Sequence, residues 1–237
     1  MPKHGKRYNN VSELVDRDKA YAPEEAVAMV KMTANAKFDE TIEAHLRTSA
    51  DPRHAEQQIR TVALLPHGLG KQVRVLVFAQ GDAAQTAREA GADFVGSDDI
   101  IQRIEGGWVE FDTAIATPDL MGRVGRLGRI LGRKGLMTNP RTGTVVQPQD
   151  IRRAVDEAKK GRVEVRMDRT AIIHAPIGKA SFEEAALVDN LTSLIDIINR
   201  NRPSAIKGSF IRSSYLTSTM GPSVKLDLSS LLSLKVE

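Results

Sequence analysis

The apolar and polar positions repeat with one period at the two ends of the chain and with another in the middle. Residues 41–48 alternate apolar and polar side chains, which predicts a half-buried strand, and a second strand is expected at residues 60–65. The period of two returns at residues 163–168 and 171–174. Both ends therefore predict antiparallel strands with one face in water.

Two helices are predicted to accompany these strands. Pro23 opens a helical pattern that runs to about Asn35, with acidic residues in its first turn. Ser181 and Glu184 have the spacing of a capping box for a second helix, which ends before Pro203. Each pattern has one apolar stripe, so each helix is expected to cover a sheet.

The middle of the chain alternates strands with helices. Its strands are apolar runs at residues 71–79, 93–95 and 111–116, and a longer helix is expected at residues 149–160. Such alternation is typical of βαβ units with a parallel sheet covered by helices.

We therefore predict an α/β fold with two domains. Residues 1–68 plus 160–237 form a discontinuous α+β host domain with split β-α-β character. Residues 69–159 form an inserted, Rossmann-like α/β domain with a parallel sheet. An insertion leaves both termini in the host, which explains why the same pattern occurs before and after the middle.

Composition limits the function. The 237 residues include 41% hydrophobic and 27% charged residues, which describes an ordinary globular protein, and no apolar run is long enough for a bilayer. The N-terminus lacks the apolar region of a secretory signal, so we expect a cytoplasmic protein with no membrane partner. There are no cysteines, which excludes disulfides and Cys-ligated metals.

Enzyme motifs matter here, because the inserted domain resembles a nucleotide-binding fold. The strand at residues 71–79 runs into Gln80-Gly81-Asp82 without the further glycines of a dinucleotide fingerprint. The five histidines lack metal-binding spacing, and no nucleophile elbow occurs. We predict no enzyme, no cofactor and no metal; the alternatives are a nucleotide-linked enzyme with a Rossmann-like domain and a protein-interaction scaffold.

The stretch 208–224 is rich in hydroxyl groups and nearly free of acid. Hydroxyls, a guanidinium and backbone N–H groups near a glycine suit phosphate and ribose oxygens. The alternative is an edge strand with solvated hydroxyls. The candidate RNA-binding residues here are Lys207, Arg212, Ser213, Ser214, Thr217, Thr219, Met220 and Gly221.

A second candidate region leads into the strand at residues 41–48. Taken alone, Phe38 favours core packing. Next to a basic residue it is also a candidate for RNA contact, flanked by the hairpin around residues 166–179. These candidates are Lys37, Phe38, Thr41, Arg166, Arg169, His174 and Lys179.

The densest positive charge lies at residues 122–141, which contain no acid. A helical projection places several arginines on one ridge beside an apolar stripe. The four glycines of this segment lower its helix propensity, which makes sense if another backbone approaches closely. The alternative is a glycine-faced helix packed on the sheet with a solvated arginine edge. The candidate RNA-binding cations are Arg123, Arg126, Arg129, Arg133, Lys134 and Arg141.

Several stretches in order along the chain carry a family resemblance, among them AKFDETIE, LPHGLGKQVRVLVFA, LGRILGRKGLM, IHAPIGKASF and TSTMGPSVK. With them the sequence resembles the L-one family of large-subunit ribosomal proteins in its bacterial form. The resemblance implies a non-enzymatic, two-domain protein that binds 23S rRNA mainly through the discontinuous domain. By position it assigns RNA contact to Lys37, Phe38, Thr41, Arg169, His174, Ser213, Thr219, Met220 and Gly221.

The same resemblance implies further partners. These are other large-subunit components, the leader of the protein's own mRNA, whose translation it would repress, and E-site tRNA, whose release in the deacylated form it would aid. The inserted domain is expected to contact another rRNA helix through its basic ridge. This chain departs from the family in having Arg133 where proline is usual, and Thr138 and Arg141 in the following loop.

Overall fold

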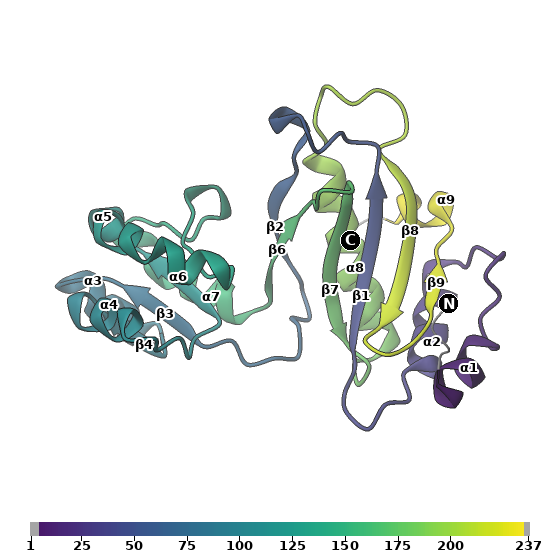
Figure 1. The fold of residues 1–237 in the computed structure, drawn as a ribbon, viewed down its shortest axis with the longest axis horizontal. Coiled ribbons are helices and arrows are strands. Elements are labelled where there is room, and N and C mark those ends of the chain that lie inside the picture. The colour runs from purple at the N-terminus through teal and green to yellow at the C-terminus, as the bar shows by residue number, and fades with distance from the viewer. Residues whose placement is uncertain (1–4, 235–237) are drawn as a thin grey trace. The chain divides into compact units, whose positions relative to one another are not determined.

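A computed structural model describes residues 5–234 (Figure 1). The chain divides into two compact units: residues up to Gly70 together with those from Val163, and Lys71–Arg162. The sequence placed these junctions after residue 68 and before residue 160. Below, the first is called the discontinuous unit and the second the inserted unit.

The discontinuous unit is built on a four-stranded sheet in the order β7-β1-β8-β9. Its strands, all antiparallel to their neighbours, are β1 (Thr41–Thr48), β7 (Ile172–Lys179), β8 (Ile211–Ser218) and β9 (Ser223–Lys225). A separate two-stranded sheet pairs β2 (Arg60–Leu64) with β6 (Arg162–Arg166). Since β8 lies between β1 and β9, the edge-strand alternative for the hydroxyl-rich stretch is wrong.

Helices cover one face of the four-stranded sheet. Its inward residues Ile42, Ala44 and Leu46 are fully buried, and they share a core with α2 (Pro23–Thr33) and α8 (Glu184–Arg200). Figure 1 shows α8 behind β1 and β7, which leaves the facing side of the strands bare. The short helices α1 (Lys6–Ser12) and α9 (Leu228–Ser233) complete the unit.

The predicted capping box of α8 is wrong. The N-cap residue is Glu183, and no side chain caps this end of the helix. The Ser181 hydroxyl instead donates to Asp39 Oδ2 at 2.8 Å, and the Ser181 backbone N–H donates to Asp39 Oδ1 at 3.1 Å. Ser181 therefore joins the start of α8 to the loop before β1.

The inserted unit has a parallel sheet in the order β4-β3-β5, with β3 (Val75–Phe78), β4 (Phe94–Gly96) and β5 (Thr113–Ala116). The apolar run of β3 is continuous because both faces are covered. One face packs on α3 (Asp82–Glu89) and α7 (Ile151–Lys159). The other packs on α4 (Asp98–Glu105), α5 (Met121–Val124) and α6 (Gly128–Arg133).

Five short 3-10 segments complete the secondary structure of the described chain: Ala55–Gln57, Pro118–Leu120, Gly125–Leu127, Pro140–Thr142 and Pro148–Asp150. Within residues 5–234, no helix is both long and apolar enough to cross a membrane. The α/β class predicted from the sequence is confirmed, although the first strand of the inserted unit is shorter than the predicted 71–79.

Candidate nucleic-acid interface

The bare face of the four-stranded sheet carries polar side chains from three strands. On β1 these are Thr41, Glu43, His45 and Arg47, each alternating with a buried neighbour. The register places His45 opposite His174 of β7 on one side and Tyr215 of β8 on the other. We call this surface, with Ser213 and Thr217 of β8, the open face.

Two histidines lie at the centre of the open face. His45 Nδ1 is 2.8 Å from His174 Nδ1, and His45 Nε2 is 2.9 Å from the Thr217 hydroxyl oxygen. One ring must donate and the other accept, so the pair requires at least one neutral imidazole. Burial lowers the pKa of His45 below its ordinary value, His174 lowers it further, and Glu43 opposes this. These contacts fix the orientation of a surface that can donate hydrogen bonds.

One end of the open face is held by a buried carboxylate, Glu40, which is only 1% exposed. Its Oε1 accepts from the Ala36 backbone N–H at 2.8 Å, and its Oε2 accepts from the Met220 N–H at 2.9 Å. Burial raises the pKa of Glu40, but these N–H groups and Arg7 outweigh burial, so the pKa lies below its usual value. Glu40 thus ties the loop before β1 to the turn after β8.

Two large apolar side chains project from these tied loops. Phe38 is 55% exposed and Met220 is 49% exposed, so the core-packing alternative for Phe38 is wrong. Beside them the Thr219 hydroxyl accepts from the Thr41 N–H at 3.0 Å and donates to the Thr41 carbonyl at 3.2 Å. Lys179 Nζ donates to the Thr41 hydroxyl at 2.8 Å. The structure brings these predicted residues together, and we call them the Phe38–Met220 end.

The other predicted residues of this unit are more scattered. Lys37, Lys207 and Arg212 are exposed, while Ser213 and Gly221 are partly exposed. Arg166 lies on β6 in the smaller sheet, and Arg169 lies in the turn before β7.

Ser214 does not belong to the open face. Its side of β8 also carries Leu216 and Ser218, and it points into the helix-covered core with no exposed surface. Among the described residues its hydroxyl has no hydrogen-bond partner. The prediction that Ser214 contacts RNA is therefore wrong, because a hydroxyl-rich sequence does not by itself tell which face of a strand is solvated.

The basic ridge of the inserted unit is real but interrupted. A 3-10 turn at Gly125–Leu127 separates α5 from α6, and Arg123 bonds to Asp98 at 2.8 Å, so this arginine has an acidic partner that the sequence did not suggest. Within residues 5–234, the other cations of the ridge have no carboxylate within 4.0 Å: Arg126, Arg129, Arg133, Lys134 and Arg141.

The glycines of the ridge face outward. A Cβ added at Gly122, Gly125, Gly128 or Gly132 would meet no described atom within 4 Å. Val124, Leu127 and Leu131 make the contact with the sheet instead. No other backbone of the described chain approaches these glycines, so the close approach suggested by the sequence is not made within residues 5–234. The alternative of a glycine face packed on the sheet is wrong. The helix backbone is bare next to the free arginines.

Comparison with known proteins shows what the chain is related to. Residues 30–222 match the ribosomal protein L1p/L10e family. The chain belongs to this family.

Relatives named large ribosomal subunit protein uL1 support the same conclusion over nearly the whole length. The chain is 57% identical to the one from Chloroflexus aggregans, with all of both chains covered. It is 55% identical to that of Thermomicrobium roseum, covering 97% of this chain and 96% of the relative, and 54% identical to that of Dehalococcoides mccartyi strain BAV1, covering 96% of each. The family resemblance drawn from the sequence is confirmed.

For this L1p/L10e family member, the matched residues include the Phe38–Met220 end, the open face and the basic ridge. Sequence reasoning missed Glu40, His45 and Arg47. The burial of Glu40 could have been predicted, because in an extended chain it lies on the same side as the buried residues Ile42 and Ala44. Residues 5–234 contain no group of three or more His, Cys, Asp or Glu side chains placed to hold a metal ion.

Proposed function

We propose that this chain is a structural protein of the large ribosomal subunit that binds 23S rRNA through the open face and the Phe38–Met220 end. The observation that carries the proposal is the exposure of two large apolar side chains, 55% for Phe38 and 49% for Met220, on loops tied by the buried Glu40. Exposed apolar side chains on rigid supports suit the bases and sugars of folded RNA. The hydroxyls and lysines beside them suit its phosphates.

The inserted unit has a second role in this proposal. Its free ridge cations contact a different rRNA helix, because they lie on another unit and have no carboxylate partner among residues 5–234. E-site tRNA and the leader of the protein's own mRNA are proposed as further RNA partners, by family. The alternative of a nucleotide-linked enzyme rested on the parallel sheet alone, and no further observation favours it.

The test is direct binding of purified protein to transcripts that tile 23S rRNA, with 16S rRNA transcripts of equal length as controls. We expect one 23S region to bind far more tightly than any 16S transcript, with an affinity that falls as salt rises, because phosphate contacts release counterions. A transcript of the mRNA leader should compete for the same surface. Equal binding to all transcripts would contradict specific recognition. Binding to none of them would contradict the proposal and favour the alternative of a protein-interaction scaffold.

A further inference from the structure

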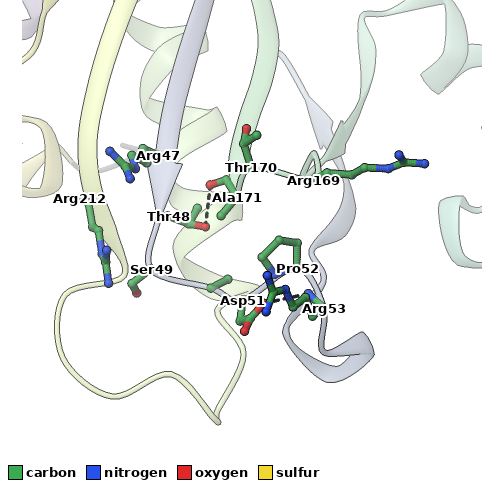
Figure 2. Close-up of a pocket in the computed structure, with 11 residues that line it drawn as sticks. Arg47, Thr48, Ser49, Asp51, Pro52, Arg53, Arg169, Thr170, Ala171 and Arg212 are labelled. Carbon is green, nitrogen blue, oxygen red and sulfur yellow. Dashed lines mark hydrogen bonds between the residues drawn. The ribbon is translucent and has the colours of Figure 1, made fainter.

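The opposite end of the open face holds a pocket whose lining joins two of the predicted RNA-binding residues, Arg169 and Arg212, with two arginines that the sequence analysis did not single out. Its volume is about 410 Å³, and it is formed where β1 ends, where β8 begins and where the chain turns into β7. Its lining includes four arginines: Arg47, Arg53, Arg169 and Arg212. In Figure 2, Arg47 and Arg212 extend from neighbouring strands on the same side of the pocket, whereas Arg169 points away from them.

A β-bulge places Arg212 at this pocket. Arg47 pairs with Ser213 and Thr48 pairs with Ile211, so Arg212 is the extra residue of β8. Strict alternation would put Arg212 on the buried side with Ser214, but the bulge turns it to solvent. The exposed Arg47 lies next to it on β1. Two guanidinium groups therefore face water at neighbouring strand ends.

The charge of the pocket is not balanced within the described chain. None of its four guanidinium groups has a carboxylate within 4.0 Å among residues 5–234. The one acidic residue in the lining, Asp51, accepts a hydrogen bond from the Arg53 backbone N–H at 2.9 Å and lies 3.9 Å from the His54 ring. Gathering like charges without a partner is unfavourable unless an anion binds there.

The turn that forms one wall is held in a strained conformation. Ala171 has φ of 64°, and it is the one non-glycine residue with a positive φ in the described part of the chain. Asp168 accepts from the backbone N–H groups of Thr170 and Ile172, both at 2.8 Å, and Thr48 donates its hydroxyl to the Ala171 carbonyl at 3.0 Å. Such strain persists only where surrounding contacts enforce it, and it concentrates at binding sites.

The donors that the pocket presents to solvent are guanidinium groups, those of Arg47 and Arg212 among them. A guanidinium presents a planar fork that matches two phosphate oxygens. The Ser49 hydroxyl oxygen is buried and has no hydrogen-bond partner among the described residues, so it does not add to these donors. The arginines therefore supply the donors of a phosphate site.

We infer that this pocket binds a phosphodiester group of the bound RNA, at a stretch separate from the one held at the Phe38–Met220 end. The inference rests on the function proposed above. Arginines spread around an open rim suit a polyanion better than one small ion. The eight residues of β1 separate the two ends by about 23 Å, at roughly 3.3 Å per residue, which is more than one nucleotide spans.

The experiment compares wild-type protein with an Arg47→Gln/Arg212→Gln variant. The probe is the 23S rRNA fragment that wild-type protein protects from nuclease. We expect the variant to bind more weakly. The slope of log affinity against log salt concentration should become shallower by up to about two units, roughly one for each phosphate that is no longer neutralised. An Arg47→Lys/Arg212→Lys variant should keep the salt slope but lose affinity, because lysine lacks the guanidinium fork. The matched control is Arg17→Gln/Arg200→Gln, which changes two exposed arginines of the same unit outside the pocket and should bind as wild type does.

A second readout assigns the contact to the RNA backbone. In fragments with single methylphosphonate linkages, wild-type protein should lose affinity at one or two positions where the Gln variant shows no further loss. Equal affinity and slope for wild type and the Gln variant would overturn the inference and leave the proposed function intact. Failure of the wild type to bind any fragment would overturn both. Saturable binding of inorganic phosphate that does not compete with RNA would identify a small-anion site and overturn the RNA assignment.

Discussion

The Phe38–Met220 end of the discontinuous unit and the basic ridge of the inserted unit are built in opposite ways. At the Phe38–Met220 end, the candidate side chains are fixed by bonds within the fold, such as Thr219 with Thr41 and Lys179 with Thr41. In the inserted unit, Arg126, Arg129 and Arg133 stand free beside bare glycines. Fixed donors favour recognition of one shape, because little freedom remains to be lost on binding. Free cations favour any phosphate backbone, so the comparison predicts specificity from the Phe38–Met220 end and salt-sensitive attachment from the basic ridge.

The largest expected effect comes from removing the free cations. Changing Arg126, Arg129, Arg133 and Lys134 together to Gln should make the salt slope shallower by up to about four units, and lower the affinity at 0.1 M salt by up to about a thousandfold. We expect this loss only for a long rRNA fragment that includes a neighbouring helix, and almost none for the minimal site. The measurement is the salt dependence of binding for both RNAs.

The matched control changes four exposed cations of the same unit on the other face of its sheet, Arg88, Arg152, Arg153 and Lys160, to Gln. It should leave both RNAs bound as by wild type. Equal loss on the minimal and long RNAs from the ridge variant would place the ridge in the primary site. If the ridge variant lost no affinity for either RNA, the ridge would be a solvated helix edge and the contrast between the two surfaces would be wrong.

The next effect tests the fixed surface. Met220→Asp places a carboxylate next to RNA phosphates and should cost at least about 2 kcal/mol of binding, roughly thirtyfold in Kd, for both the minimal and the long RNA. Thermal melting should change little, since Met220 is 49% exposed. Met32→Asp is the control, because Met32 is 56% exposed on α2 outside the open face. A collapse in Tm for Met220→Asp would instead show that Met220 supports the fold.

A third effect separates support from contact. Glu40→Gln keeps one acceptor oxygen and leaves one of the two bound N–H groups without its partner, which should lower the free energy of unfolding by about 1–3 kcal/mol. The pKa of Glu40 is below its ordinary value of 4.5, so the stability it contributes is present above that pH and is lost as pH falls further. Urea unfolding from pH 7 to pH 3 should therefore show a smaller acid destabilisation in the variant.

Glu110→Gln, at an exposed position before β5 and with no ion pair within residues 5–234, is the control for that series and should unfold as wild type does at every pH. If Glu40→Gln matched the wild type throughout, the two loops would be held by other contacts, and the exposure of Phe38 and Met220 would need another explanation.

The sequence predicted those features of the molecule that depend on local interactions, and it missed those that depend on contacts between distant segments. Strand β1 could be predicted because alternating apolar and polar residues are what a strand with one buried face requires. The strands of the inserted sheet could be predicted because continuous apolar runs are what strands buried on both faces require. The ion pair of Arg123 with Asp98, the hydrogen bond from the Met220 N–H to Glu40 and the turning out of Arg212 all depend on contacts between distant segments. Periodicity carries no information about such partners, so the sites could be located by region but not by geometry.

The smallest expected effect concerns the histidine pair and links stability to binding. Because burial and His174 hold the pKa of His45 below 6.5, the unfolded chain binds more protons than the folded one as pH falls below that value. Stability from this group is thus complete above about pH 6.5 and is lost at lower pH, and the loss should stay under about 1 kcal/mol because the ring is partly exposed. RNA phosphates favour the protonated ring. Negative charge is already present beside each histidine of the pair, since Glu43 lies 3.9 Å from His45 and Asp168 lies 3.5 Å from His174, so the added effect of the phosphates is small. RNA affinity should therefore rise slightly over the same pH range in which Tm falls.

His45→Gln should remove both trends, while the exposed His54→Gln control should keep them. If Tm fell equally in wild type and His45→Gln, the pair would be a passive part of the open face.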